Sequence, residues 1–400
     1  MKFRSPLISF ISVGLIAAAG MGVKSFLRSG SNSMVRPREA IALTKVDQQI
    51  LRAQQLIARM PNRADGYNQL AAAFMQKARE TGNFALNANA ESEINRSLSV
   101  EKENYDALKL LGKLQLTYHR FSEALATARQ AQKVRTDDHD VWGQITDALV
   151  ELGDYREAVK SAQFMMDLRP DSSSYARVSY LRSLHGDTEG AIQAMVTAVK
   201  AANPNDPEAI AWCRTHLGDE LMNAGKSNEA EHQYDEALRV FPAHPLATDG
   251  KARARIAAGD LQSAMQIYEA KQANGASADV AQALGDLYSR MGDADKARRQ
   301  YAAFEVLERE NAAIEKSWRH LVNYWLDHDS NLSEALVLAT GEYKSRKDIF
   351  TCDSLAWALF KNGRLVEAKK MIAEALRTGS KDSRIQNHAE VIYKAVKQAR

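Results

Sequence analysis

Two histidines with neighbouring carboxylates are candidates for binding a metal ion. His320 and His328 stand eight residues apart in a stretch expected to be helical, and Asp327 and Asp329 flank the second histidine. Imidazole and carboxylate groups bind zinc, but a metal site needs three or four ligands that converge on one point. Nothing in this spacing makes them converge, so the pattern favours a solvated polar helix face over a metal site.

A second polar cluster comprises Asp137, Asp138, His139 and Asp140, directly before an amphipathic segment. Aspartate is favoured at helix starts because its side chain accepts hydrogen bonds from free N–H groups and its charge opposes the helix dipole. We therefore interpret the cluster as a turn and a helix cap.

The only two cysteines, Cys213 and Cys352, are far apart, and neither belongs to a C-x-x-C pair. A disulfide framework is excluded on this count, while a single bridge stays open. A cysteine nucleophile needs a lowered pKa and a nearby base. Cys352 falls at a core position of the repeat described below, which favours a small buried apolar residue over a nucleophile.

Sequence motifs that hold phosphates, dinucleotides, acyl groups or catalytic zinc do not occur. The chain has no G-x-x-x-x-G-K-[ST], G-x-G-x-x-G, G-x-S-x-G or H-E-x-x-H. We therefore expect no enzyme activity, no catalytic residue, no cofactor and no bound metal.

Composition and charge describe a folded chain with a basic head. The 400 residues are 45% hydrophobic and 26% charged, as in ordinary globular proteins. The formal net charge of +3 combines +5 on residues 1–40 with −2 on the remainder. Residues 41–400 therefore lack the surplus positive charge that nucleic-acid binding requires, and no nucleic-acid partner is expected.

The first 24 residues have the pattern of a targeting segment. Lys2 and Arg4 precede an apolar run at 7–23, which ends at Lys24. Such a pattern is typical of a signal peptide, and the run also reaches the ~17 residues that a membrane-spanning helix needs. We place an uncleaved membrane anchor slightly ahead of a cleaved signal. Either interpretation predicts export, with an extracytoplasmic, periplasmic body in a bacterial cell.

A polar linker is expected at 25–46, with Ser-Gly-Ser-Asn-Ser at 29–33, and a helix from about Pro37 to Met60.

Small residues recur beyond this point at intervals of 33 to 41 residues. The clearest stretch is 139–170, two short amphipathic segments separated by Leu152-Gly153-Asp154 and ended by Pro170. Counted from His139, Trp142 is at position 4, Thr146 at 8, Gly153 at 15 and Ala158 at 20. Alanine occupies position 20 in nine successive stretches: Ala90, Ala124, Ala158, Ala191, Ala230, Ala264, Ala297, Ala335 and Ala368.

This pattern resembles the tetratricopeptide repeat (TPR), whose W-x2-L-G-x2-Y…A-x3-F…P signature residues 139–170 follow. Some segments, such as 353–368, also resemble a widespread bacterial repeat family that has no agreed activity. The resemblance implies an all-α, right-handed superhelical solenoid of about nine helix-turn-helix units, preceded by an N-terminal hydrophobic helix. We expect the array at 47–382 and a C-terminal capping helix at 383–400, with units starting near 64, 105, 139, 172, 211, 245, 278, 316 and 349.

Three unit spacings exceed the usual 33 or 34 residues, and each predicts a local insertion. The first lies at 77–89, with a turn at 81–83. The second is 203–207, where Asp206 should cap the next helix and Pro207 should open it. The third, 305–316, has no glycine or proline and should lengthen the second helix of the seventh unit.

The resemblance also implies a ligand groove lined by the first helix of each unit, at about positions 2, 5, 9, 12 and 13. The groove residues chosen on this basis are Tyr180, Trp212, Asp219, Asn223, His320, Tyr324, Phe350, Trp357 and Phe360. Tyrosine and tryptophan concentrate where binding energy is high. For Phe350, Trp357 and Phe360 the alternative is that they receive the terminal helix. The Lys/Asn/Arg carboxylate clamp of one TPR subgroup is not reproduced, since Lys109, Lys113 and Asn223 lie in distant units.

The leading hypothesis is a non-catalytic protein-interaction scaffold, exported or membrane-tethered through residues 7–23, that holds a peptide or protein segment in its concave groove. The alternative is an accessory subunit of an envelope machine that assembles or exports polysaccharide, because aromatic groove residues also suit sugars.

Overall fold

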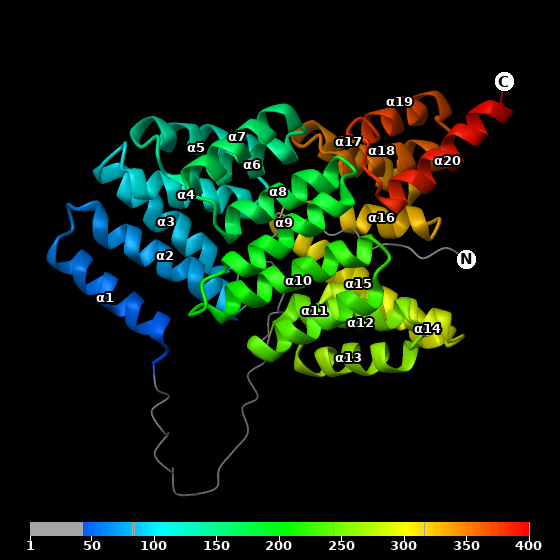
Figure 1. Cartoon of the computed structure of the whole chain (residues 1–400), viewed down its shortest axis with the longest axis horizontal. Helices are drawn as coiled ribbons and strands as arrows, with labels where there is room; N and C mark the ends of the chain where they lie inside the picture. Colours follow the sequence, from blue (N-terminus) through cyan, green and yellow to red (C-terminus); the bar gives the residue numbers. More distant parts are fainter. Residues whose placement is uncertain (1–42, 82, 84, 243, 316, 400) are drawn as a thin grey trace, which may run out of the picture. The chain divides into compact units, whose positions relative to one another are not determined.

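The computed structural model describes residues 43–81, 83, 85–242, 244–315 and 317–399. Within these ranges it contains twenty α-helices and no strand (Figure 1). The predicted all-α repeat fold is confirmed. The predicted targeting segment at 1–24, with its hydrophobic helix, lies outside the described residues.

Eighteen helices form nine helix-turn-helix units, each with a first helix A and a second helix B. The A helices are α2 (Ala64–Thr81), α4 (Tyr105–Thr117), α6 (His139–Glu151), α8 (Ser172–Leu184), α10 (Pro207–Asn223), α12 (Pro245–Ala257), α14 (Ala278–Arg290), α16 (Arg319–Asp327) and α18 (Ile349–Lys361). The B helices are α3 (Ala85–Val100), α5 (Phe121–Val134), α7 (Tyr155–Leu168), α9 (Thr188–Ala201), α11 (Ser227–Val240), α13 (Leu261–Asn274), α15 (Ala294–Glu315), α17 (Leu332–Ser345) and α19 (Leu365–Ala375). One further helix stands at each end, α1 (Lys45–Arg59) and α20 (Ser383–Gln398).

The described residues fall into two compact units, 43–111 and 112–399, and α4 contributes to both. Within residues 43–111, α1 packs on α2 and α2 packs on α3. The helix predicted to begin near Pro37 begins instead at Lys45, because Thr44 is extended and forms a capping box with Asp47. Asp47 also forms an ion pair with Lys77 of α2, at 2.6 Å.

Close packing of helix A on helix B explains the recurring alanine at position 20. Eight of these nine alanines have no solvent-exposed surface, and Ala297 is 4% exposed. The facing residue at position 8 is small for the same reason. A Cβ atom added to Gly218 would come within 2.6 Å of the Tyr234 ring, and the Ser179 hydroxyl donates to the Ala191 carbonyl at 2.8 Å.

From the second helix-turn-helix unit to the ninth, the turn between helix A and helix B contains a left-handed residue. Gly153, Gly186 and Gly259 have φ values of 78°, 76° and 84°, which cost glycine little. In the second unit the histidine at the same position, His119, adopts φ 55°. An aspartate commonly follows and caps helix B, as Asp260 does by accepting from the Ser263 amide at 3.1 Å.

The three long spacings have structural counterparts. The first extends α2 to 18 residues. At the second, Asp206 accepts from the Ala209 amide at 3.0 Å and Pro207 is the first residue of α10, as predicted. The third extends α15 to 22 residues, whereas none of the other B helices is longer than the 16 residues of α3.

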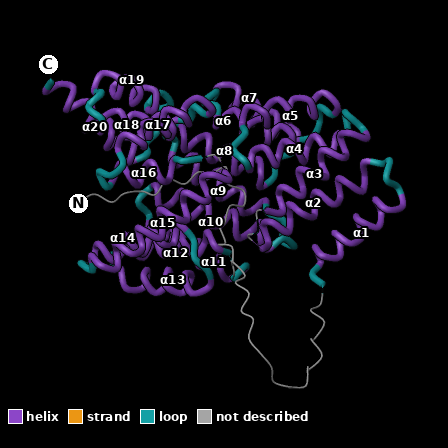
Figure 2. The backbone as a smooth tube through the Cα atoms, turned by 180° about the vertical axis from the view of Figure 1, so that it is seen from behind, coloured by secondary structure: helices purple, strands orange, loops and turns teal. Residues whose placement is uncertain are grey.

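Within residues 112–399, the connection between the eighth and ninth repeats contacts the third repeat. The Lys347 amide donates to the Glu151 carbonyl at 3.0 Å, and the Ile349 amide donates to the Tyr155 hydroxyl at 2.9 Å. The Arg346 side chain is buried there in an ion pair with Glu151. Both views show α17 beside α6 and α7 (Figures 1 and 2). Residues 195 positions apart in the sequence therefore close this part of the solenoid on itself.

The close approach at position 8 yields a matched pair of variants. Gly218→Ala should lower the free energy of unfolding by about 1–3 kcal/mol, since its Cβ would overlap the Tyr234 ring. Gly341→Ala in α17, where an added Cβ atom would meet no atom of another part of the chain within 4 Å, should leave the free energy of unfolding unchanged or raise it by ~0.5–1 kcal/mol. Urea unfolding measures both, and an equal loss for the two variants would refute the packing argument.

Candidate functional site

Asp219, one of the predicted groove residues, is used inside the fold. Its carboxylate accepts from the Tyr234 hydroxyl at 2.8 Å, forms an ion pair with Arg253 of α12 at 2.6 Å, and lies 3.2 Å from the Nδ1 atom of His216. The carboxylate pKa is lowered: burial alone would raise it, but the Arg253 charge and the hydrogen bonds outweigh burial. This network links helix A of one unit to helix A of the next.

Similar A-to-A links recur along the array. Arg177 of α8 donates to both carboxylate oxygens of Asp147 of α6, at 2.8 and 2.6 Å. Asn323 of α16 accepts from the Ser354 hydroxyl of α18 at 2.8 Å. Polar groups at or near groove positions therefore serve to join neighbouring repeats, which leaves fewer of them for a ligand.

Other predicted groove residues in the middle units differ in exposure. Tyr180 is only 8% exposed, and burial raises its pKa well above the usual value. Trp212 is half-buried, with its ring edge-on to His216 at 4.1 Å. Asn223 is exposed at the end of α10.

One predicted aromatic residue of the last unit, Trp357, contacts the terminal helix α20. Trp357 stacks on His388 of α20 at 4.1 Å and 7°, and on Phe360 at 4.9 Å and 16°. His388 is held by Asp353, at 2.9 Å, while Phe350 is buried. For Trp357 this contact agrees with the packing alternative, although Trp357 and Phe360 keep part of their surface exposed.

The two histidines first considered as metal ligands do not meet. His320 is half-exposed and lies 3.6 Å from Glu308, whereas the His328 ring packs on Tyr324 at 4.3 Å. Both Cys213 and Cys352 are buried free thiols, and burial raises their pKa values to about 12 and 11. These thiols are poorly suited to nucleophilic chemistry.

Among the described residues, Asp138, His139 and Asp140 are the one group with three ligand atoms within 4.8 Å of one another. A cation already stands there, since the Arg169 guanidinium contacts His139 and donates to Asp171 at 2.8 Å. Asp138 caps α6 through the Asp140 amide at 2.8 Å. The cluster is used as the turn and cap that its sequence suggests.

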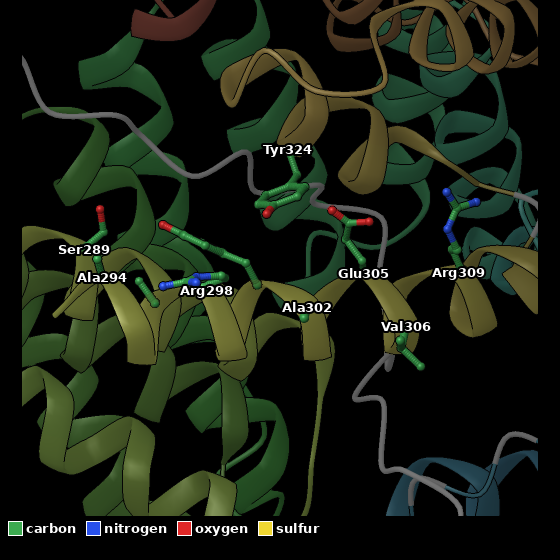
Figure 3. A pocket seen from close by; sticks show the side chains of 10 residues that line it. Ser289, Ala294, Arg298, Ala302, Glu305, Val306, Arg309 and Tyr324 are labelled. Carbon is green, nitrogen blue, oxygen red and sulfur yellow. The ribbon is translucent and has the colours of Figure 1, made fainter.

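The open site lies where the seventh unit meets the eighth. Because α15 is extended and packs only lightly against α16, a cavity of about 620 Å³ remains between α14, α15 and α16. Arg298, Glu305 and Arg309 rise from three different turns of α15, and Tyr324 reaches toward them from α16 (Figure 3). The lining residues are Ser289, Ala294, Ala297, Arg298, Tyr301, Ala302, Glu305, Val306, Arg309 and Tyr324.

Two tyrosines form the aromatic part of this pocket. The rings of Tyr301 and Tyr324 lie 5.4 Å apart, and the Tyr301 hydroxyl donates to Asp286 at 2.8 Å. Tyr301 lies over Gly285, where a Cβ atom would come within 2.5 Å of its ring. Tyr324 is the one predicted groove residue that lines the pocket.

Sequence reasoning missed the α15 side of the pocket. Arg298, Tyr301, Glu305 and Arg309 lie on a B helix, whereas the groove offsets count only A helices. The available signal was the 38-residue spacing of the seventh unit, which predicts a longer helix B but not the cavity beside it.

Comparisons with known proteins agree with this architecture. A family model of the tetratricopeptide repeat matches residues 215–278. A human IFIT1 dimer with m7Gppp-AAAA is 14% identical, has a TM-score of 0.53, and is matched over 83% of this chain and 77% of that one. A monomeric IFIT1 mutant with Gppp-AAAA is 16% identical, with a TM-score of 0.51 and coverage of 83% and 76%.

The APC/C hetero-tetramer Cut9–Hcn1 is 13% identical, has a TM-score of 0.49 and is matched over 87% of this chain but only 60% of that one. At such identities the likeness shows the fold alone. No curated protein sequence matches the chain.

A buried carboxyl beside the Asp219 network gives a pH test. Glu220 is fully buried, one oxygen accepts from the Ser183 hydroxyl at 3.1 Å, and the other has no partner among the described residues. Burial raises its pKa to about 8 from a usual 4.5. The stabilising contribution of the protonated form is therefore complete below about pH 4.5 and is lost as pH rises from there to about 8. Glu220→Gln should lose less stability than the wild type over this pH range, as measured by urea unfolding.

The control is Glu229→Gln, at an exposed position of α11, which should follow the wild-type pH curve. Parallel curves for Glu220→Gln and the wild type would contradict a buried, neutral Glu220.

Proposed function

We propose that this tetratricopeptide-repeat protein is a non-catalytic scaffold that holds a segment of another protein in the pocket between α14, α15 and α16. Its fold supports a protein-interaction role, because stacked helical repeats produce extended concave surfaces. The partner is a peptide or protein segment, and no cofactor is required.

The observation that carries the proposal is the pocket itself. A cavity of about 620 Å³ falls within the size range of ligand sites, ~300–1,000 Å³. Its wall combines two tyrosine rings with the Arg298 and Arg309 guanidiniums, and tyrosine and arginine are enriched at binding hot spots. Other groove residues, such as Asp219, already have partners within the fold.

A nucleic-acid ligand is not proposed, although IFIT1 is solved with capped RNA. The residues beyond the basic head sum to −2, whereas nucleic-acid binding requires a surplus of lysine and arginine at the phosphates. No observation in the described residues favours the polysaccharide alternative.

Export or membrane tethering is part of the proposal and rests on sequence alone. None of the described helices is long and apolar enough to cross a membrane, and the apolar run at 7–23 lies outside the described residues. The basic residues before the run and its length support an anchor or a signal peptide.

Site-specific crosslinking tests the pocket in cells. A photo-crosslinking amino acid at Ala302, in the pocket wall, should form a discrete adduct with a partner protein. The same amino acid at Val337, which is 69% exposed on α17, should not form it. Tyr324→Ala should abolish the Ala302 adduct, while circular dichroism shows that the variant is folded. An adduct that is equal at both positions, or that survives Tyr324→Ala, would refute the pocket as the binding site.

Topology has its own test. Protease added to bacterial spheroplasts should digest the body, detected by an antibody to the repeats, because export places residues beyond 24 outside the cytoplasmic membrane. A body that is protected until the membrane is dissolved would contradict export and leave the pocket proposal standing.

A further inference from the structure

We propose that the pocket between α14, α15 and α16 recognises a basic side chain, a lysine or an arginine of the partner segment, through the Glu305 carboxylate and the rings of Tyr301 and Tyr324. This inference rests on the proposed scaffold function and adds the chemistry of the bound segment.

The two guanidiniums in the pocket wall already have acidic partners. Arg298 forms an ion pair with Asp295, one turn earlier on α15. Arg309 lies 3.2 Å from Glu334 of α17, and its guanidinium also stands over the Trp325 ring at 4.8 Å. Both positive charges are thus compensated by groups that are not part of the pocket wall.

Glu305 is different. Its side chain is half-buried in the pocket wall, and it has no ion pair or hydrogen bond with any described residue. The other carboxylate beside the tyrosines, Asp286, accepts from the Tyr301 hydroxyl. The charge left uncompensated in the pocket wall is therefore negative, and it stands in its middle, between the turns of α15 that carry Arg298 and Arg309 (Figure 3).

The tyrosines lie where they can assist a cation. Tyr324 and Glu305 face each other from α16 and α15 (Figure 3). Burial together with the negative charge of Glu305 raises the pKa of Tyr324 to about 12, which is consistent with this proximity. Tyr324 lines the pocket although it is only 6% exposed, since Phe304 and His328 pack on its ring. Its hydroxyl makes no hydrogen bond with a described residue, so it can accept from a ligand N–H group at the pocket wall. A tyrosine ring also attracts a cation that lies over its face.

These features discriminate between classes of partner segment. A basic side chain would pair with Glu305 in a partly desolvated site, where charge-assisted hydrogen bonds are strong. An apolar segment would cover Glu305 and leave its charge without a partner, which is unfavourable. An acidic segment would in addition be repelled, so lysine or arginine is the side chain that the pocket fits.

Selection from a random peptide library displayed on phage tests the inference. Full-length protein in detergent is the target, and the selected peptides are then measured by fluorescence anisotropy. Wild-type protein should enrich peptides with a shared lysine or arginine. Changing that residue to norleucine, or Glu305→Gln in the protein, should weaken binding by about tenfold, as expected for a lost charge-assisted hydrogen bond. Glu305→Lys should reverse the preference and enrich aspartate or glutamate.

The matched control is Glu310→Gln, an exposed residue of α15 outside the pocket wall, which should bind like wild type. Peptides whose binding requires Tyr324 but which show no lysine or arginine preference would overturn this inference and leave the scaffold proposal intact. Failure to enrich any peptide whose binding depends on Tyr324 would overturn both.

Discussion

The buried ion cluster around Arg346 is the interaction on which the second half of the array depends. Arg346, between α17 and α18, contacts Glu151 of α6, Asp348 at 3.0 Å and Glu342 at 3.4 Å, and Arg319 reaches Asp348 at 3.3 Å. Three carboxylates face two guanidiniums in a site that solvent hardly reaches. Burial accordingly raises the pKa of Glu151 to about 7. Burying such a cluster costs desolvation free energy, and removing one partner costs more because a buried charge is left unpaired. The cluster therefore contributes a defined arrangement of the helices that supply it.

That arrangement extends to the pocket. Arg319 is the first residue of α16, the helix that carries Tyr324. The Glu342 carboxylate also accepts from the Ser317 hydroxyl and the Trp318 amide, at 3.0 and 3.1 Å, and thus holds the chain between α15 and α16. The gap beside the long α15 is therefore bounded by a helix whose start is fixed from α6, α17 and α18. A groove with fixed walls binds without an ordering cost, which is an advantage for a scaffold.

The repeat fold could be predicted because its determinants are local and recur. Ala264 at the helix crossing and Gly259 at the turn are each required by contacts within one unit, so spacing alone reveals them. The contacts that shape the candidate site join different repeats and do not recur at a fixed spacing. Asp219 lies at a repeat position expected to line the groove, yet its carboxylate forms an ion pair with Arg253 of the next repeat. Arg346 binds Glu151, a residue 195 positions away in the sequence. The long repeat spacing predicts the extension of α15. Whether that extension leaves a pocket depends on the position of α16, which the spacing does not predict.

Amide hydrogen exchange of the wild-type protein tests the closure most directly. Lys347 lies in a connection and Ile349 is the first residue of α18, positions whose amides have no partner in an isolated repeat. Here they donate to the Glu151 carbonyl and the Tyr155 hydroxyl. Exchange as slow as in the interior of α18 is predicted for both amides, with Tyr155→Phe accelerating Ile349 alone. Rapid exchange of both amides in the wild-type protein would show that the third repeat is not joined to the connection between the eighth and ninth repeats, and would contradict the account.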